Sequence, residues 1–507
     1  MSQKKMHTQK RVRYTNLLRW SALSATVFLA GCTLAPQYER PGSPVENQWP
    51  EMGVGVAPEE VVGLVAIDLE WQKFFGDERL KTLIGTALEN NRDLRVAILN
   101  IEKAQAMYHV QRSDLIPTLG ANGQLSRQST SGTGSTANTV GASDGDLYTA
   151  SIGIASYELD LFGRIRSLNA AAVANYMGTI EARKSVQMSL VTNVAMAYYA
   201  LLADDELLKL TEETLRTREE SLKLTILKFE NGVSSELDVR QAQTLVEGAK
   251  STLSQLRRQR AQDENALVLL LGSEIPKDLP EGASFEQQIN LMPELRSEVP
   301  SEVLIRRPDV VAAEYQLIAA NANIGAARAA FFPRISLTTS LGKASTDLDT
   351  LFSNGYVWSF VPQISLPIFT GGANVANLKS SKVSKEIAIA QYEKAIQAAF
   401  KDVSDALAGR ATYGEQLNSM QALVAASERV YELSDLRYTN GVASYMDLLD
   451  AQRSLFSAQQ QKIAAQLAML NNQVTLYKAL GGGWSQADEE KLKQEFKQSN
   501  DRLESEK

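Results

Sequence analysis

The chain has 507 residues, of which 44% are hydrophobic, and a formal net charge of -7. Six Lys or Arg residues and no acidic ones precede Trp20, so loss of that segment would leave a charge of about -13, which argues against nucleic acid as a partner. The chain has two histidines, His7 and His109, and one cysteine, Cys32. These are too few for a His/Cys metal site or a Ser/His/Asp triad, so we expect neither an enzyme nor a bound metal or cofactor.

The N-terminus has the pattern of a secretory signal peptide over residues 1–31. It begins with basic residues, continues as an apolar run from Trp20 to Ala30 that is too short to span a bilayer, and ends in small residues. The letters LAGC, which end at Cys32, resemble the bacterial lipoprotein signal. This resemblance implies that Cys32 becomes the acylated first residue of the mature chain and, with Thr33 beside it, that the protein is sorted to the outer membrane. The alternative is an ordinary signal peptide with an incidental cysteine.

Residues 32–60 are rich in Pro, Glu and Gly and predict an extended strap between the anchor and the first helix. Two later stretches, 93–117 and 309–333, predict helices of about two dozen residues, each ended by its proline. His109 lies inside the first of them with no carboxylate or cysteine cluster near it. We therefore interpret it as a packed or surface histidine rather than a ligand.

After each proline the hydrophobic pattern alternates, as in a β-strand with one apolar face. Residues 333–341 place three apolar side chains on one face, namely Ile335, Leu337 and Leu341. Residues 357–368 show the same alternation more strongly, with Trp358, Phe360, Pro362, Ile364, Leu366 and Ile368 on one side. Weaker alternation at 118–126 and 147–162 predicts a matching pair of strands in the first half of the chain.

These strands predict two hairpins, 118–162 and 333–369, with polar loops at 127–146 and 342–355 that belong at an exposed tip. One polar and one apolar face fit a membrane barrel with a wet lumen; periodicity alone fits soluble hairpins equally well. Four strands cannot close a barrel, because the smallest membrane barrels use about eight. In a membrane, several chains would share one barrel, since open edges cannot face lipid.

Two stretches of about 66 residues, 164–229 and 373–438, contain no proline and have a helix-forming composition. Each would make a helix about 100 Å long. Apolar residues recur seven apart in both, at Val194, Leu201, Leu208, Leu215, Leu222 and Phe229 and again at Val403, Leu417, Val424, Tyr431 and Tyr438, with Arg410 as the exception. This period predicts supercoiled helix packing rather than a globular core; a simple two-stranded coiled coil is the alternative.

A short stretch occurs twice, 209 residues apart. Residues 231–243 read NGVSSELDVRQAQ, and residues 440–452 read NGVASYMDLLDAQ. Each copy lies between two predicted helices, so we expect Gly232 and Gly441 to end one helix in the left-handed conformation. A serine then caps the next helix, either Ser234 or Ser235 in the first copy and Ser444 in the second.

The second copy differs in having two acidic residues, Asp447 and Asp450, three apart on one helical face, where the first copy has Asp238 and Gln241. These two carboxylates at a hairpin tip are our candidate site. The plainer alternative is a solvated helix start, where acidic residues are favoured anyway by the helix dipole.

The duplication predicts two similar halves, 61–272 and 308–484, joined by a proline-rich segment at 273–307 and followed by a charged tail at 485–507. The helices after the tips, together with the two-dozen-residue helices, match the long helices in length. The expected fold is therefore an α+β membrane protein. Its helical tube has walls that run down in one piece and return in two, and this tube continues into a membrane β-barrel.

Four motifs, in this order, resemble the TolC-like outer-membrane efflux channels, in the lipoprotein branch that includes OprM. They are LAGC, SEVLIRRPDVVAAEYQLIAANANIGAARAAFFPRISL at 301–337, LPIFTGG at 366–372 and RYTNGVASYMDLLDAQRSLF at 437–456. The resemblance covers nearly all of the mature chain. It implies a homotrimer with a twelve-stranded barrel in the outer membrane and a twelve-helix periplasmic tunnel. It also implies docking to a periplasmic adaptor and an inner-membrane pump, usually a proton-driven drug exporter.

The same resemblance assigns the second tip to a periplasmic gate. It implies that Asp447 and Asp450 of three chains line the entrance, where six carboxylates would draw in cations and give block by multivalent cations. It also implies an apolar constriction at Met446, as in the OprM branch. In the closed state Tyr438 would be tied to Asp238 on the neighbouring hairpin.

One family feature is missing, because the arginine latch of TolC itself falls on Ala443 and must be absent or replaced here. With that exception, we expect a passive exit duct that opens at its acidic tip. The competing hypothesis is a lipid-anchored periplasmic adaptor or scaffold built on coiled-coil hairpins, which would have no need of two pairs of amphipathic strands.

Overall fold

A computed structural model describes residues 33–46, 48–49, 64–66, 69–128, 145–296, 304–353 and 355–484. The signal peptide, Cys32 and the charged tail lie outside these ranges. The chain divides into two compact units. Of the described residues, unit 1 contains 33–41, 101–179 and 313–392, and unit 2 contains the rest.

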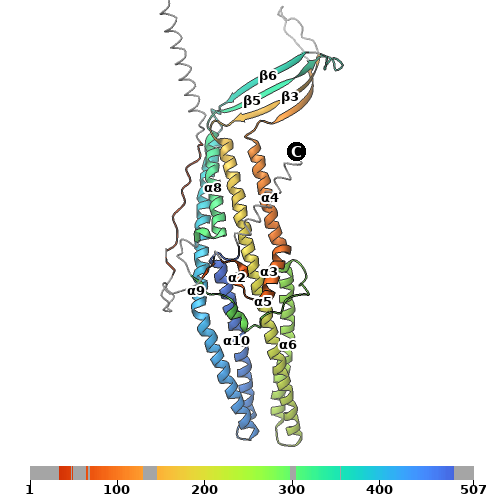
Figure 1. Cartoon of the computed structure of the whole chain (residues 1–507), viewed down its shortest axis with the longest axis vertical. Helices are drawn as coiled ribbons and strands as arrows, with labels where there is room; N and C mark the ends of the chain where they lie inside the picture. The colour runs from red at the N-terminus through yellow and green to blue at the C-terminus, as the bar shows by residue number, and fades with distance from the viewer. Residues whose placement is uncertain are drawn as a thin grey trace, which may run out of the picture. The chain divides into compact units, whose positions relative to one another are not determined.

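The order of elements repeats along the chain (Figure 1). The first half has α4 (Arg92–Ser113), β2 (Leu119–Gln128), β3 (Gly145–Leu159), α5 (Arg164–Glu230) and α6 (Glu236–Leu271). The second half has α8 (Pro308–Ala329), β5 (Arg334–Ser345), β6 (Tyr356–Ser365), α9 (Ala373–Thr439) and α10 (Tyr445–Ala479). Both α5 and α9 have 67 residues, which confirms the two long helices that the proline-free stretches predicted.

Short elements accompany the two repeats in unit 2. Before α4 come α2 (Trp71–Phe74) and α3 (Glu78–Asn90), and between the repeats lies a 3-10 helix, η2 (Gln287–Leu291). The strands β1 (Leu64–Val65) and β4 (Leu295–Arg296) pair in parallel. The proline-rich segment between the repeats is thereby tied to the start of the first one.

The helices α4 and α8 end four residues before their prolines, Pro117 and Pro333, and not at them as predicted. In α4 the last turn tightens through a hydrogen bond from the Ile116 N–H to the Ser113 carbonyl, 3.0 Å long. The same bond joins Phe332 to Ala329 in α8, also at 3.0 Å. A residue before proline is forced out of the α conformation, so the helix must finish early.

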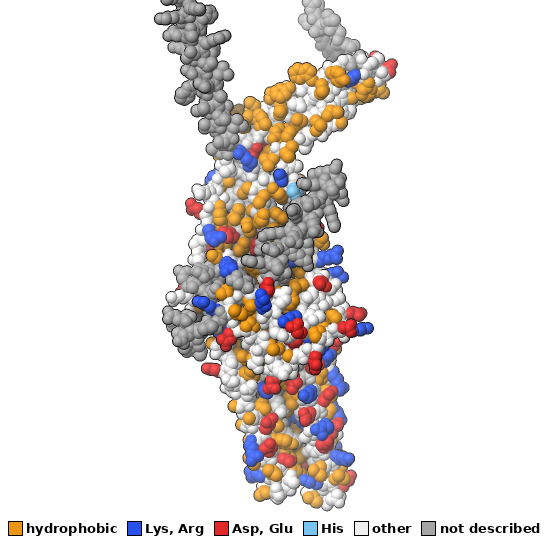
Figure 2. Space-filling model, viewed as in Figure 1, with side chains coloured by type: hydrophobic (Ala, Val, Ile, Leu, Met, Phe, Trp, Pro, Cys, Tyr) orange, Lys and Arg blue, Asp and Glu red, His pale blue; other side chains and the backbone are white. Residues whose placement is uncertain are grey.

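In unit 1 the four strands form one antiparallel sheet in the order β2-β3-β5-β6. Leu341 lies opposite Trp358 and Leu337 opposite Pro362. Directly opposed residues share a face of the sheet, so the register confirms the apolar face predicted from the sequence. This face is open: Trp358 is 74% and Phe360 59% exposed, and Figure 2 shows hydrophobic side chains gathered over the sheet.

The strand β3 carries an irregularity that the sequence did not reveal. Ile154 is paired with Thr339, but the next pair joins Tyr157 to Leu337, so β3 has one extra residue at this point. Ser156, inside this bulge, has a φ of 57°, in the left-handed region. The bulge keeps Tyr157 on the same face as Ile154 despite their odd spacing. This extra residue breaks the alternation at 147–162.

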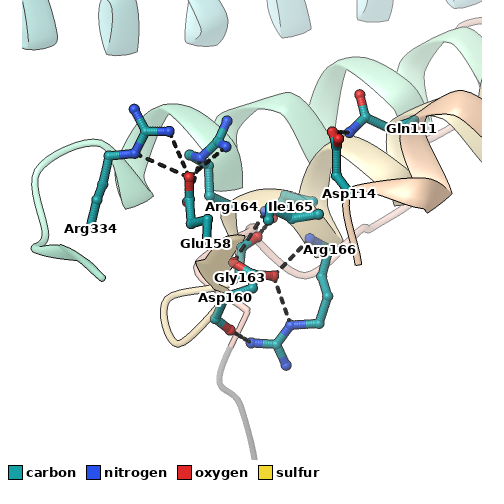
Figure 3. Close-up of polar contacts among 10 residues, drawn as sticks. Gln111, Asp114, Glu158, Asp160, Gly163, Arg164, Ile165, Arg166 and Arg334 are labelled. Carbon is teal, nitrogen blue, oxygen red and sulfur yellow. Dashed lines mark hydrogen bonds and ion pairs between the residues drawn. The ribbon is translucent and has the colours of Figure 1, made fainter. Parts of the chain in front are cut away.

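A group of ion pairs joins the sheet to the helix that follows it (Figure 3). The Glu158 carboxylate accepts hydrogen bonds from both Arg164, at 2.8 Å, and Arg334, at 2.6 Å. Asp160 accepts a hydrogen bond from the backbone N–H of Arg166, 2.8 Å away, in the first turn of α5. A carboxylate is favoured at a helix N-terminus, so these contacts hold the first turn of α5 against the end of β3.

The main hydrophobic core lies in unit 2, where α3 packs on α6 and where residues of α3, α5, α6 and α10 form one buried cluster. Phe74 and Tyr477 stack with their ring centroids 3.9 Å apart. The fully buried residues around them include Leu80, Ile84, Val194, Leu271, Leu470 and Val474. Within the described ranges α5 is the helix long and apolar enough to cross a membrane, but more than half of its apolar stretch is buried, as in the core helix of a soluble domain.

The α5–α6 pair follows the predicted seven-residue period, but its buried line is partly polar. Of the predicted apolar line, Val194 and Leu201 are buried, whereas Phe229 near the tip is exposed. A second line on α5, also seven apart, is buried and was not predicted: Asp204, Thr211, Arg218 and Thr225. Beside it, exposed carboxylates of α5 pair with basic residues of α6, as Glu212 does with Arg257 at 3.0 Å.

Candidate gate at the hairpin tips

Both tips turn through the predicted glycines, which have φ values of 75° at Gly232 and 72° at Gly441. At the first tip the N–H of Val233 bonds to the Lys228 carbonyl at 2.8 Å. The Val442 N–H makes the same contact with Arg437, at 2.9 Å. These six-residue closures are the usual way of ending a helix at a left-handed glycine. The predicted role of both glycines is confirmed.

The return helices α6 and α10 begin with capping boxes. Ser235, rather than Ser234, is the N-cap of α6, and its hydroxyl accepts a hydrogen bond from the N–H of Asp238 at 3.2 Å. Ser444 caps α10 in the same way, with the N–H of Asp447 at 3.2 Å. In each box the aspartate carboxylate accepts a bond from the N–H of its N-cap serine. Helix capping therefore explains why this aspartate is present in both copies of the repeat.

The hydrogen bonds at Asp238 also act on its titration. Burial raises the pKa of this carboxyl, but the hydrogen bonds from the Ser235 backbone and from the hydroxyls of Ser234 and Ser235 outweigh it and hold the pKa below its ordinary value. Asp238 therefore stays ionised in mildly acidic medium. It keeps its capping hydrogen bonds in the first turn of α6 under these conditions.

The structure places Asp447, Asp450 and Met446 together on the exposed side of the first turns of α10. The opposite side of the same turns is buried. Asp450 forms an ion pair with Arg453, three residues on, which the sequence spacing allowed but which we did not predict. Of the two candidate carboxylates, Asp447 thus has a capping role as well as an exposed charge, and Asp450 has a cationic neighbour.

Tyr438 lies at the end of α9, between the two hairpins. The ammonium of Lys228 sits 4.3 Å from the centroid of its ring, and the ring of Tyr445 lies 5.2 Å away. No hydrogen bond between Tyr438 and Asp238 is present within the described part of the single chain. The closed-state contact between Tyr438 and Asp238 stays a prediction. Within the described chain, the ring of Tyr438 contacts the ammonium of Lys228.

The two hairpins pack on one another through a small apolar cluster that sequence reasoning missed. Its buried members are Ala242, Tyr445, Leu448 and Leu449. The hydroxyls of Tyr445 and Ser221 are 3.3 Å apart. Deeper in the same region, Arg218 donates to the Leu245 carbonyl at 3.2 Å and lies over the ring of Phe456. The spacing of Tyr445, Leu448 and Leu449 would have indicated a buried helical face.

The structure describes the strap from Thr33 onward. The predicted lipidation site, Cys32, directly precedes it and lies outside the described residues. Residues 33–41 run without regular secondary structure along α8. Asn321 and Arg328 of α8 donate to the strap carbonyls of Pro36, at 2.8 Å, and Leu34, at 3.0 Å. Arg40 forms a two-point ion pair with Glu314 at 2.7 and 2.8 Å.

A glycine makes this contact possible. At Gly325 a Cβ atom would come within 2.7 Å of the backbone nitrogen of Ala35, so only glycine lets the strap lie this close to α8.

Within the described ranges, no three His, Cys, Asp or Glu residues gather as a metal site would require.

Known proteins are similar to this chain in fold and in sequence. The family profile described as "Outer membrane efflux protein" matches residues 83–273 and 299–482. The toluene efflux pump outer membrane protein TtgC of Pseudomonas putida is 49% identical over 465 residues, covering 91% of this chain and 95% of the relative. Outer membrane protein OprJ of Pseudomonas aeruginosa is 40% identical over 470 residues, covering 92% and 96%.

The solved structure of the open state of the Neisseria gonorrhoeae MtrE outer membrane channel superposes with a TM-score of 0.79 at 40% identity. The match covers 90% of this chain and 99% of that one. A likeness of this extent defines an outer-membrane channel protein. The chain belongs to the outer membrane efflux protein family, which confirms the resemblance drawn from its motifs.

Family membership decides between the two hypotheses that the sequence left open. Members of this family are passive efflux channels rather than enzymes. The protein is therefore an exit duct of the outer membrane that extends into the periplasm, and not a scaffold.

Proposed function

We propose that three copies of this chain form the exit duct of a tripartite efflux system. In this assembly the three sheets close one twelve-stranded barrel in the outer membrane, and the long helices of three chains form a twelve-helix periplasmic tunnel. A periplasmic adaptor and an inner-membrane pump, which we expect to be a proton-driven exporter, complete the system. The duct conducts drugs or other small solutes passively, and the pump supplies the energy.

The observation that carries this proposal is the unfinished sheet. Its edge strands, β2 and β6, each have one side without a partner in the described chain, and one face exposes large apolar side chains. A sheet edge cannot face lipid unpaired, because each free N–H or C=O there costs several kcal/mol. Pairing the β6 edge of one copy with the β2 edge of the next satisfies both, and twelve strands leave room for a pore that eight would fill.

The lipid anchor supports the same placement. A signal-type sequence ends at Cys32, and the strap that follows it is held along α8 of unit 1, the unit that contains the sheet. Thr33 lies with its hydroxyl 3.5 Å from that of Ser167, in the first turn of α5 and close to the end of β3. An acyl chain on Cys32 would therefore start near the end of the sheet, where the inner leaflet of the outer membrane would meet the barrel.

The partners are proposed from the relatives. Proteins 49% identical to this one are named as outer membrane components of toluene and antibiotic efflux pumps. By analogy we expect the cognate pump of this protein to select the solute, since a passive duct adds little selectivity beyond its gate.

The proposed function is tested on the purified, acylated protein. We expect it to migrate in detergent as a trimer that dissociates on heating and to form ion-conducting pores in planar lipid bilayers. Three copies per particle with single-channel steps would support the duct. A monomer that leaves the membrane once its lipid is removed and that passes no current would contradict the proposed trimeric duct.

The proposed gate is tested by changing Asp447 and Asp450 to Asn together. In a trimer this removes six carboxylates from one ring, so we expect the cation preference of the pore and its block by multivalent cations to be lost. Bilayer reversal potentials in a salt gradient measure the preference. Glu286→Gln, an exposed carboxylate outside the tips, is the matched control and should leave both properties unchanged. Unaltered selectivity in the Asp447/Asp450 variant would remove the acidic ring from the mechanism.

A further inference from the structure

The buried polar line on α5 contains one acidic residue, Asp204, which is only 7% exposed. It lies beside the main core of unit 2, close in sequence to the buried residues Leu201 and Ala203. An ionised carboxylate in such a place is costly unless donors surround it. The question is which group stabilises it.

The groups around Asp204 are mostly acidic. Its carboxyl is within hydrogen-bonding reach of the Asp263 carboxyl on α6, whose Oδ2 also accepts a hydrogen bond from Gln259 at 3.0 Å, and the charge of Asp205 lies next to it on α5. The one cation nearby is Arg260 of α6, but this guanidinium is already bound to Asp205 at 2.6 Å and to Glu264 at 2.7 Å. Oδ2 of Asp204 has no hydrogen-bond partner among the described residues.

Two ionised carboxylates cannot hydrogen-bond to each other, because both are acceptors only. One proton resolves the conflict, since a carboxylic acid can donate to a carboxylate. We propose that Asp204 and Asp263 form a proton-binding site in which one shared proton fastens α5 to α6. Each copy of the chain carries one such site, and it does not depend on trimer formation or on the proposed gate.

A proton fits this site better than a metal ion. Calcium takes six to eight oxygen ligands and magnesium six, several of them waters that need space around the ion; here Asp204 is buried and Arg260 occupies the carboxylates of Asp205 and Glu264. Only the Asp204 and Asp263 carboxyls are left, and no group of three or more candidate ligands is found within the described residues.

The environment places the titration of this pair near neutrality. Burial, the hydrogen bond with Asp263 and the negative charges of Asp263 and Asp205 raise the pKa of Asp204 to about 7, while Arg260 acts weakly in the opposite direction. In the unfolded chain an aspartate titrates near pH 4 (about 3.9). The folded protein therefore holds the proton more tightly than the unfolded one. The contribution of the pair to stability is full below about pH 4 and is lost as the pH rises through about 7.

The experiment compares the full-length wild-type protein in detergent with Asp204→Asn and Asp263→Asn. Asparagine keeps the shape of the protonated side chain and can donate to the remaining carboxylate at any pH. Between about pH 5 and about pH 8.5 we expect the melting temperature of the wild type to fall, and its infrared carboxylic-acid band to disappear in the same step. Both Asn variants should lose this step and melt higher than the wild type at about pH 8.5.

Glu212→Gln is the control, because it removes an exposed carboxylate of α5 and its ion pair with Arg257 of α6 but touches none of the groups around Asp204. It should still show the step. The proposal is overturned if both Asn variants keep the wild-type step or melt lower than the wild type at the higher pH. It is also overturned if magnesium or calcium raises the wild-type melting temperature there and Asp204→Asn abolishes that rise, since the site would then hold a metal ion.

Discussion

Phe360→Arg is expected to prevent assembly of the channel in the outer membrane. Phe360 lies in the middle of β6 on the apolar face, opposite Thr339, with most of its side chain exposed. In the proposed barrel this face meets lipid, where an arginine near the bilayer midplane costs about 2–4 kcal/mol. Three copies in one barrel carry that cost three times. We expect loss of the heat-dissociable trimer from outer-membrane fractions and accumulation of degraded or aggregated chain.

The matched control is Ser359→Arg, one residue earlier at the same depth. Ser359 is on the polar face, with its hydroxyl 2.7 Å from that of Ser340, and this face would line the wet lumen. The Ser359→Arg variant should form a trimer and reach the outer membrane, with altered conductance as the main effect. Equal assembly of both variants, measured by semi-native electrophoresis of membrane fractions, would argue against a lipid-facing apolar side.

Arg307→Ala is expected to destabilise unit 2 by about 1.5–3 kcal/mol, because it removes a buried guanidinium and leaves the carbonyl of Ala479 without its donor. Arg307 is almost fully buried just before α8. Its guanidinium donates to Asp309 at 2.7 Å and to the carbonyl of Ala479, at the end of α10, at 3.0 Å. It also reaches Asp402 of α9 at 3.4 Å. One side chain thus joins α8, α9 and α10.

The pKa of Asp309 reflects its contact with Arg307. Burial raises the pKa of its carboxyl, but the hydrogen bonds and charge of Arg307 outweigh burial and bring the pKa below its ordinary value. Without Arg307 the partly exposed Asp309 carboxylate would lose its two hydrogen bonds to the guanidinium, and Lys478 would be the cation left near it.

Denaturant unfolding of the detergent-purified protein measures the loss at Arg307. Arg307→Lys should recover only part of it, because one ammonium cannot replace a planar group with five donors. Arg240→Ala is the control: Arg240 is exposed and pairs with Glu236 four residues away, so its removal should cost under about 1 kcal/mol. A similar unfolding curve for the Arg307 and Arg240 variants would show that the buried contacts of Arg307 contribute little.

The features predicted best from the sequence are those set by local or strictly periodic rules. The long helices α5 and α9 begin at the predicted residues and end one residue later than predicted. The tips follow equally local rules. A glycine suffices to end one helix, and a serine with an aspartate three residues later suffices to begin the next. The strand register follows from alternation alone wherever the alternation is regular.

The features that were missed depend on residues far apart in the chain. Arg307 contacts a carbonyl 172 residues away. Nothing in the sequence distinguishes Arg307 from its neighbour Arg306 as the residue that makes this contact. Asp204 is 59 residues from Asp263, and only the packing of α5 on α6 brings two like charges together. For the gate, exposure of Asp447 and Asp450 could be expected from the sequence, but their surroundings in an assembly depend on other chains.

The bulge in β3 also bears on how the two halves of the chain have diverged. The strands β5 and β6 pair without interruption, whereas β3 has one residue more than the stretch of β5 opposite it. If β6 replaced β3 by recombination between the repeats, every side chain beyond Ser156 would point to the wrong surface. Although the gene duplicated, its two hairpins are therefore no longer exchangeable parts, and shortening the first at this position by a single codon would invert the end of its strand.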